Sequence, residues 1–266
     1  MAHLIPCISR HKYQQLARSE GEGGRRYVTP DGKKLPSVTT ILGFTKDQTG
    51  LNEWKARVGE QEAERIKNEA ATIGTFMHLS IEQFLRQRPL QAPKTVEACT
   101  GYGMGYRIIN ELLLQNLSEV WGNEIPLYYP GLYAGTADLI GVYKGSPSII
   151  DFKQSNKPKR KDWIEDYFLQ LAAYALAHDM VHKTHIDGGA ILVCVRNTGE
   201  LQEFTTSGDE FENYKAKWLA RVDKYYKLTT VENSVEKATD TSEGGNDGNG
   251  NADEFESALA NLNRVA

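Results

Sequence analysis

Two short apolar segments, each carrying one aspartate and separated by a Lys-Gly-Ser-Pro break, constrain the fold of this chain most strongly. Gly and Pro favour a tight reversal, so residues 135–153 are predicted to form a β-hairpin. With a four-residue loop at 144–147, Asp138 lies opposite Lys153, and Asp151 lies diagonal to it. Because side chains alternate along a strand, Asp151 and Lys153 share one face. The three polar groups are therefore expected to form one patch.

Such a patch has two interpretations. An Asp–Lys pair at a strand end can be a surface salt bridge, worth about 0–1 kcal/mol. Two carboxylates and an ammonium on neighbouring strands can also hold a divalent cation and cut a phosphodiester, because Mg²⁺ prefers oxygen ligands and polarises phosphate. Beside a metal, the pKa of Lys153 is expected to be lowered, since a like charge disfavours the ammonium form. Lys153 would then act as a base or as an electrostatic group.

A helix is predicted after the hairpin. Residues 162–180 form an amphipathic run whose apolar positions recur at three- and four-residue steps. Gln170 and Tyr174 are four residues apart, so they lie on one side of that helix. They are either ordinary polar residues of a helix surface or groups that reach a bound strand and orient Lys153.

A longer helix is predicted upstream, over residues 60–88. Gly74 inside it costs about 1 kcal/mol relative to Ala, which indicates close packing against another element. His78 lies one turn further on and is either a surface or core histidine or a ligand for metal or phosphate. Glu124 opens a strand-like segment before Asp138 and is either a third acid of the metal region or the capped end of a strand.

Charge is unevenly distributed along the 266 residues, whose net charge is −4. Residues 229–256 hold eight acids and one lysine, and Arg264 follows them, so residues 1–228 carry +2. A basic cluster follows the hairpin: Lys157, Lys159, Arg160 and Lys161. It is either a solvated loop or a salt-sensitive phosphate contact. Trp163 and Tyr167 beside it could stack on unpaired bases.

Several short motifs occur in a characteristic order, and together they carry a family resemblance. They are Tyr27-Val28-Thr29-Pro30, Pro36-Ser37-Val38-Thr39-Thr40-Ile41-Leu42, Leu51-Asn52-x-Trp54-Lys55, Gly74-Thr75-x-x-His78, Glu124, Gly135-Thr136-x-Asp138, Ile150-Asp151-Phe152-Lys153 and Gln170-x-x-x-Tyr174. This order resembles the RecB-like exonuclease branch of the PD-(D/E)XK nuclease superfamily. Within it, the pattern is similar to the mitochondrial genome maintenance exonuclease group and related bacteriophage exonucleases. Ala137 stands where the superfamily has a proline.

The resemblance implies an α/β fold: a restriction-endonuclease-like core with a mixed central β-sheet flanked by helices and a helical N-terminal part. It also implies metal-dependent DNA cleavage with one or two Mg²⁺ or Mn²⁺ ions. The residues it assigns to metal binding or catalysis are Asp138, Asp151, the Phe152 carbonyl, Lys153, His78 and Glu124. Gln170 and Tyr174 would support DNA and the lysine.

The chain divides into four predicted parts: an N-terminal extension at 1–26, a nuclease domain at 27–228, a disordered acidic linker at 229–254 and a short amphipathic segment at 255–266. The linker is too polar to bury a core. The amphipathic end is either a weakly helical terminus or a docking segment for a replication or recombination protein.

Composition is that of an ordinary globular chain, with 40% hydrophobic and 25% charged residues. No stretch reaches the roughly 20 apolar residues that span a membrane, and the first residues lack a secretory signal. Cys7, Cys99 and Cys194 are far apart, which disfavours a zinc ribbon or a four-cysteine cluster and fits a reducing compartment. We expect action in a cytoplasm, that of a bacterial host if the chain is of phage origin, with the mitochondrion as the alternative.

Three functions follow from these features. The first is a DNA exonuclease that prefers single-stranded ends and acts in DNA replication, recombination or degradation; here, exonuclease polarity and strand preference come from the resemblance alone. The second is a structure-selective endonuclease of the same fold. The third is a nucleic-acid-binding module that keeps the metal site without cleaving.

Overall fold

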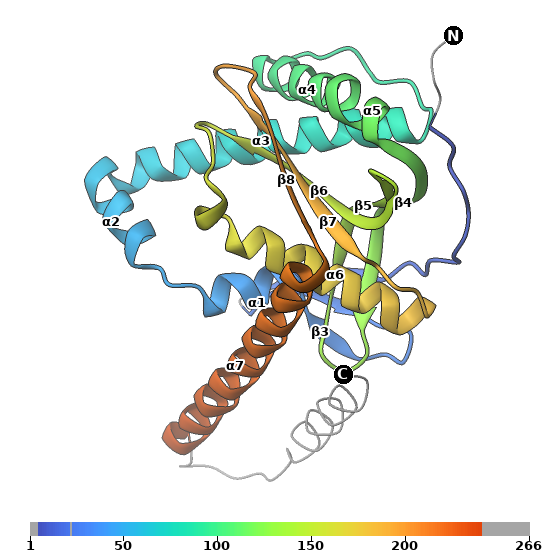
Figure 1. The fold of residues 1–266 in the computed structure, drawn as a ribbon. Helices are drawn as coiled ribbons and strands as arrows, with labels where there is room; N and C mark the ends of the chain where they lie inside the picture. The colour runs from blue at the N-terminus through green and yellow to red at the C-terminus, as the bar shows by residue number, and fades with distance from the viewer. Residues whose placement is uncertain (1–4, 22, 241–266) are drawn as a thin grey trace.

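The computed structural model describes residues 5–21 and 23–240 (Figure 1). The strands are β1 (Ala17–Gly21), β2 (Gly24–Val28), β3 (Lys34–Pro36), β4 (Leu117–Tyr129), β5 (Tyr133–Tyr143), β6 (Ser146–Ser155), β7 (Gly188–Val195) and β8 (Leu201–Ser207). The helices are α1 (Val38–Thr45), α2 (Thr49–Val58), α3 (Glu60–Leu85), α4 (Val96–Ile108), the π-helix η1 (Ile109–Leu113), α5 (Leu114–Asn116), the 3₁₀ turn η2 (Lys161–Trp163), α6 (Glu165–His182) and α7 (Gly208–Asp240).

The central sheet has five strands in the order β4-β5-β6-β7-β8. Neighbouring strands are antiparallel except for β6 and β7, which are parallel. A parallel pair needs a crossover connection, and α6 supplies it. All eight residues of β7 are buried, as expected for a strand that is covered on both faces.

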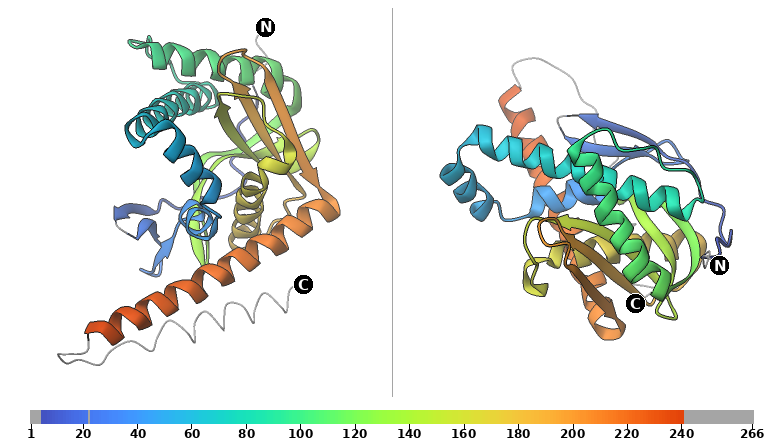
Figure 2. Two further views of the ribbon diagram at one scale, coloured as in Figure 1. Left: turned by 90° about the vertical axis from the view of Figure 1, so that its left-hand side faces the viewer. Right: turned by 90° about the horizontal axis from the view of Figure 1, so that it is seen from above.

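Helices pack on both faces of this sheet (Figures 1 and 2). On one face, Leu139, Ile150 and Phe152 pack with the apolar residues of α3 and α4. On the other face, Ile140 and Ile149 pack with α6, α7 and α1. The mixed sheet flanked by helices confirms the predicted fold class.

The hairpin between β5 and β6 is tighter than predicted. Its loop consists of Lys144 and Gly145 alone, because Tyr143 pairs directly with Ser146. Both loop residues have positive φ, +49° and +84°, the left-handed conformation of a two-residue turn that matches the twist of the flanking strands. The predicted four-residue loop at 144–147 is therefore wrong.

The shorter loop moves the register by two residues and so leaves every side chain on its predicted face. Asp138 consequently does not lie opposite Lys153. The β5–β6 ladder ends at the Leu139–Ile150 pair, and the next residues on the two strands are Asp138 and Asp151. The two strands therefore part at the position of the two acids, while β6 stays paired with β7 up to its end.

The predicted long helix is α3, but the reason given for its glycine is wrong. A Cβ on Gly74 would lie 3.7 Å from the Gln154 Cγ, an ordinary contact. The close approach lies in α4 instead, where a Cβ on Gly101 or Gly105 would come within 2.6 Å or 1.8 Å of atoms of α3. Gly74 lines the cavity that His78 and Asp138 also line.

Helix α6 is not amphipathic. Ten of its residues are buried, on all sides of the helix, because α7 packs over the side that faces away from the sheet. The left view of Figure 2 shows α7 crossing that outer surface. A helix apolar all round is a buried helix.

The predicted boundary at residue 27 divides strand β2. Residues 17–21 and 23–36 form a three-stranded antiparallel sheet, the N-terminal ribbon, in the order β1-β2-β3. The N-terminal part is therefore a ribbon followed by α1, α2 and α3, and is not only helical. The cross-strand hydrogen bonds of β2 make residues 17–26 part of the folded unit.

Helix α7 runs past the predicted start of the linker at residue 229 and ends at Asp240. Residues 229–240 contain no Gly or Pro, and extending an existing helix adds a hydrogen bond for each residue that is ordered. The rest of the predicted linker and the predicted segment 255–266 lie outside the described residues. Within the described residues, no helix is long and apolar enough to cross a membrane.

Candidate active site

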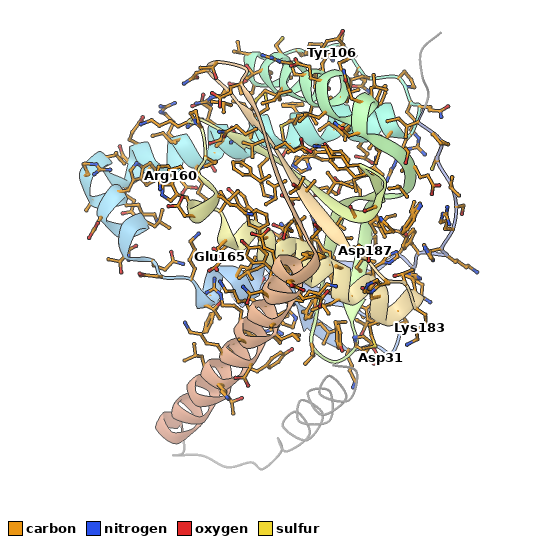
Figure 3. The ribbon with its side chains drawn as sticks, in the orientation of Figure 1. Asp31, Tyr106, Arg160, Glu165, Lys183 and Asp187 are labelled. Carbon is orange, nitrogen blue, oxygen red and sulfur yellow. The ribbon has the colours of Figure 1, made fainter. Side chains whose placement is uncertain are left out.

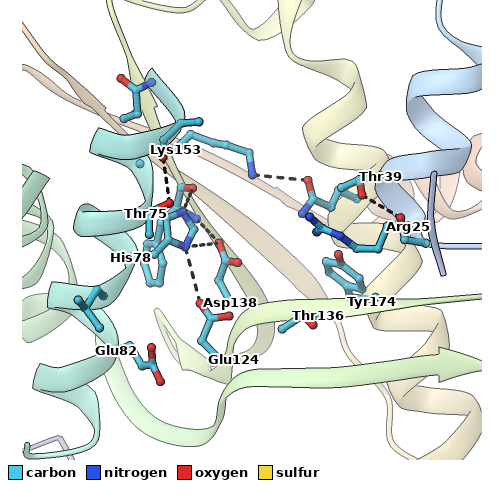
Figure 4. Close-up of a pocket in the computed structure, with 18 of the residues that line it drawn as sticks. Arg25, Thr39, Thr75, His78, Glu82, Glu124, Thr136, Asp138, Lys153 and Tyr174 are labelled. Carbon is cyan, nitrogen blue, oxygen red and sulfur yellow. Dashed lines mark hydrogen bonds and ion pairs between the residues drawn. The ribbon is translucent and has the colours of Figure 1, made fainter. Parts of the chain in front are cut away.

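A cavity of about 820 Å³ lies where β5 and β6 part. It is enclosed by α3 on one side, by the N-terminal ribbon and α1 on another, and by α6. Figure 4 shows His78, Glu124 and Asp138 toward α3, with Arg25, Thr39 and Tyr174 opposite them and Lys153 extended between the two groups. The predicted site residues that line it are His78, Glu124, Asp138, Phe152, Lys153, Gln170 and Tyr174.

Three of these residues converge on one point. His78, Glu124 and Asp138 each offer one ligand atom, and these atoms lie within 4.8 Å of one another. The Nδ1 of His78 is 3.7 Å from the Glu124 Oε1 and 3.6 Å from the Asp138 Oδ2. One helix and two adjacent strands, α3, β4 and β5, thus bring together residues that are far apart in the sequence.

The backbone of Glu124 is strained. It has a φ of +53° inside β4, a left-handed conformation that costs a non-glycine residue about 1–2 kcal/mol. The β4–β5 pairs on either side are Asn123–Leu139 and Ile125–Ala137. Glu124 and Asp138 therefore lie opposite each other at a point where the regular strand pairing is interrupted. Glu124 is therefore an interior residue of a strand, and not a capped strand end.

His78 has a hydrogen-bond partner at one ring nitrogen and two carboxylates near the other. Its Nε2 donates to the Phe152 carbonyl at 3.0 Å, and the Phe152 N–H donates to the Asp138 Oδ2 at 2.9 Å. Burial by itself lowers the pKa of His78, but Asp138 and Glu124 outweigh that effect and raise the pKa to about 9. In the protein without a bound metal ion, the two acids therefore favour the protonated imidazole, and a cation bound between them would replace that proton.

Asp151 and Lys153 form a buried ion pair next to this cluster. Asp151 is 1% exposed, and its Oδ2 lies 2.5 Å from the Lys153 Nζ. Among the described residues, the Asp151 Oδ1 has no hydrogen-bond partner. Burial raises the pKa of Asp151 to about 6, while Lys153 opposes the increase. The pair is therefore not the exposed surface salt bridge that was one interpretation of the sequence.

The pKa of Lys153 is raised by its carboxylate neighbours, an effect separate from the lowering expected beside a bound metal ion. Burial lowers it, but the carboxylates of Asp151 and Asp138 outweigh burial and raise it overall. With these carboxylates as its neighbours, the side chain is an ammonium group. Its Nζ also donates to the Gln170 Oε1 at 3.5 Å and lies 5.0 Å from the ring centre of Tyr167.

Gln170 and Tyr174 both face the cavity from α6, one turn apart. Tyr174 fits because residue 135 is a glycine. A Cβ on Gly135 would come within 2.8 Å of the Tyr174 ring and 2.9 Å of its hydroxyl. Gly135 therefore allows the ring to lie against β5, the strand that carries Asp138.

The basic cluster lies beside the site but lines none of the cavity. Arg160 pairs with Asp162 at 3.0 Å, and its side chain is 67% exposed (Figure 3). Lys161 pairs with Glu210 at 2.5 Å. Trp163 is 65% exposed, and its ring lies 5.3 Å from the Arg160 guanidinium. The backbone of Lys159 is fixed by Gln202.

Sequence reasoning missed the wall of the cavity that the N-terminal ribbon provides. Arg18, Arg25 and Tyr27 line it. The Tyr27 hydroxyl lies 3.1 Å from the Thr136 Oγ1, two residues from Asp138. The glycine-rich turn at 21–24, between two short polar segments, was the available signal for a hairpin here.

Residues 130–243 match the model of the PD-(D/E)XK nuclease superfamily. This part of the chain is therefore similar to PD-(D/E)XK nuclease domains. The matched region contains Asp138, Asp151, Lys153, Gln170 and Tyr174, whereas His78 and Glu124 precede it.

The chain is also similar to mitochondrial genome maintenance exonuclease 1 from Xenopus tropicalis, with 28% identity over 206 residues, and from Homo sapiens, with 28% identity over 204 residues. These alignments cover 73% and 72% of the chain. They cover 58% of each relative, so the chain spans less than two thirds of the length of the curated relatives it matches.

Proposed function

We propose that this protein is a metal-dependent deoxyribonuclease that hydrolyses DNA from its ends and prefers single-stranded ends. One observation carries the proposal: His78, Glu124 and Asp138 converge within 4.8 Å in the cavity, at the place where β5 and β6 part. The Asp151–Lys153 pair lies beside them. Acids that converge next to a partly buried lysine suit the cleavage of a phosphodiester, because both the metal and the phosphate need opposite charges nearby.

The residues present fit a divalent cation. A buried carboxylate oxygen of Asp151 lacks a hydrogen-bond partner among the described residues, and a cation would satisfy it. Asp138 and Asp151 would hold one or two Mg²⁺ or Mn²⁺ ions, with Glu124, His78 and the Phe152 carbonyl as further ligands. When bound, the ion polarises the scissile phosphate and lowers the pKa of a bound water.

The role we propose for Lys153 is to hold a phosphate oxygen or the attacking water. Its ammonium group lines the cavity, where Asp151 and Gln170 restrict its position. Gln170 therefore acts as a positioning residue for the lysine. Tyr174 presents its ring and hydroxyl to the same cavity from the next turn of α6.

The preference for single strands rests on the shape of the site. A cavity of about 820 Å³ is on the scale of pockets that bind small ligands, so it has room for a few nucleotides of one strand. The relatives named exonucleases support end-dependent digestion. A structure-selective endonuclease and a binder that does not cleave are the alternatives that the experiment below separates.

The biological setting is also part of the proposal. We propose roles in DNA replication, recombination or degradation, and a partner protein for the C-terminal segment, which lies outside the described residues. Cys7, Cys99 and Cys194 are free thiols, which fits a reducing cytoplasm, that of a bacterial host if the chain comes from a phage. A mitochondrial location is the alternative, in line with the names of the relatives.

The experiment incubates the purified protein with end-labelled linear and with circular single-stranded DNA, in Mg²⁺ or in EDTA. Loss of the linear DNA alone, in Mg²⁺ alone, is the expected result. Cleavage of circles would instead indicate the endonuclease, and binding without cleavage would indicate the binding module.

The matched variants are Asp151→Asn and Lys153→Ala, with Asp187→Ala and Lys144→Ala as controls. Each control removes the same charge from an exposed ion pair, that of Asp187 with His185 or that of Lys144 with Glu203. We expect the first two variants to lose cleavage while retaining their circular dichroism spectrum and DNA binding, and the controls to cleave normally. Full activity in either site variant would overturn the assignment.

A further inference from the structure

The cavity has a positively charged wall that the proposed cleavage does not use. Arg18 and Arg25 from the N-terminal ribbon line the same cavity as Asp138 and Lys153. Figure 4 shows Arg25 across the cavity from the acidic side chains. One cavity therefore has an acidic side, suited to metal, and a separate basic side.

The register of the ribbon places both arginines on one face. Arg18 on β1 lies directly opposite Tyr27 on β2, and Glu20 lies directly opposite Arg25. Residues that face each other across an antiparallel pair, and residues two apart on one strand, project to the same side. Arg18, Arg25 and Tyr27 are therefore neighbours on the face that the ribbon turns toward the cavity.

The ribbon is held against the nuclease domain at fixed points. The backbone carbonyl of Arg25 accepts hydrogen bonds from the Ser37 N–H at 2.9 Å and the Thr40 hydroxyl at 3.0 Å. Tyr27, two residues further along β2, contacts the Thr136 hydroxyl at 3.1 Å. Arg25 is thus placed about 7 Å along the strand from a residue that touches β5 beside the acids.

The two guanidinium groups differ in what they contact. Arg18 makes no ion pair with any residue in the described part of the chain. Arg25 pairs with Glu20 at 2.8 Å, and the two side chains are 38% and 60% exposed. An exposed pair of this kind is weak, worth about 0–1 kcal/mol. A phosphate, which binds arginine through two parallel hydrogen bonds, can displace the carboxylate.

We propose that Arg18 and Arg25 form a second phosphate subsite, which binds a backbone phosphate of the DNA strand near the scissile phosphate. This proposal rests on the proposed function. In the free protein, the Glu20 carboxylate pairs with the Arg25 guanidinium at the position that the phosphate would take. The hydroxyl groups of Ser37 and Thr39 also line this side of the cavity, but they are hydrogen-bonded to each other at 2.9 Å, and the Ser37 Oγ accepts from the Thr40 N–H, so the two arginines supply the donors of the subsite.

A subsite of this composition recognises phosphate and not base identity, so it fits a nuclease that digests any sequence. It differs from the basic cluster that the sequence pointed to. Arg160 and Lys161 of that cluster are paired with acids outside the cavity. The ribbon arginines therefore account for strand binding inside the cavity.

The test measures the binding of fluorescein-labelled oligothymidylate by fluorescence anisotropy in EDTA, which separates binding from cleavage, over a series of salt concentrations. Arg18→Ala and Arg25→Ala should each weaken binding about tenfold. Each should also reduce the slope of log affinity against log salt by about 0.7. Glu20→Gln should have the opposite effect and tighten binding about two- to fivefold, because it releases Arg25.

Arg107→Ala is the matched control. Arg107 on α4 is 41% exposed and pairs with Glu111 on η1, and neither residue lines the cavity. We expect its affinity and salt slope to equal those of the wild type. Arg25→Lys keeps the charge without the two-pronged geometry, so it should give an intermediate affinity if the folded state is intact.

Unchanged affinity and salt slope in both Arg18→Ala and Arg25→Ala would overturn the subsite. Equal losses on strands with and without terminal phosphates support a backbone phosphate, whereas a loss confined to one phosphorylated end would overturn that assignment. Cleavage by the wild type in Mg²⁺ is measured separately. If the wild type cleaves and the arginine variants bind DNA normally, the subsite alone is rejected. If the arginine variants bind DNA weakly and the wild type does not cleave, the proposed function alone is rejected.

Discussion

Mild acid should destabilise the protein through His178, a residue of α6 that does not line the cavity. Its side chain is fully buried. The Nδ1 lies 2.7 Å from the Thr184 hydroxyl, which itself donates to Asp179, so Nδ1 carries the proton and donates. The Nε2 then accepts from the Tyr13 hydroxyl at 3.0 Å. This network fixes a neutral imidazole.

Burial, followed by the neighbouring His182 and His11, lowers the pKa of His178 from 6.5 to about 3. Below pH 6.5 the unfolded chain therefore binds a proton that the folded protein does not, and the free energy of unfolding decreases as the pH falls. At 1.36 kcal/mol for each pKa unit, the loss is about 2 kcal/mol between pH 7 and pH 5, and at most about 5 kcal/mol by pH 3.

The assay is urea unfolding in EDTA at pH 7 and pH 5, followed by circular dichroism. His178→Gln removes the titrating group, so the decrease between the two pH values should be about 2 kcal/mol smaller than in the wild type. His185→Gln is the control, because the His185 side chain is 80% exposed. Comparing the two pH values within each variant cancels the direct cost of the substitution. Equal decreases in the wild type and His178→Gln would refute the reasoning.

Three further outcomes are expected. Gly135→Ala should reduce cleavage and cost about 1–3 kcal/mol of stability, measured by thermal unfolding, because its Cβ would come within 2.8 Å of the Tyr174 ring. Tyr27→Phe removes the hydrogen bond to Thr136 and should cost about 1 kcal/mol, measured in the same way. EDTA should abolish cleavage and added Mg²⁺ should restore it, with an unchanged far-ultraviolet spectrum, because the apolar cores on both faces of the sheet hold the fold together.

The acids on the hairpin could be predicted because strand parity depends only on local sequence. The actual loop, Lys144 and Gly145, is two residues shorter than predicted, yet Asp151 and Lys153 keep their face because the register moves by an even number. Gln170 and Tyr174 could be paired for a similar reason, since a spacing of four residues places side chains on one side of any helix.

The packing of elements that are far apart in the sequence was harder to predict. The sequence of α6 alone could not show that α7 covers its outer side, so the helix was predicted to be amphipathic. The basic loop was a candidate for phosphate binding because its charges are close together in the sequence. In the structure, Arg160 and Lys161 are paired with acids outside the cavity. Arg18 and Arg25 could not be recognised as a pair from the sequence, because only the pairing of β1 with β2 brings them together.

The sequence by itself determined which residue types were available and which of them share a strand face or a helix side, because these follow from the fixed periods of 2 and 3.6 residues. The tertiary structure alone decided that His78, Glu124 and Asp138 meet within 4.8 Å, that Asp151 is buried without a full set of partners among the described residues, and that the N-terminal ribbon lines one side of the cavity. These contacts depend on how separate elements pack against each other, which no local period encodes.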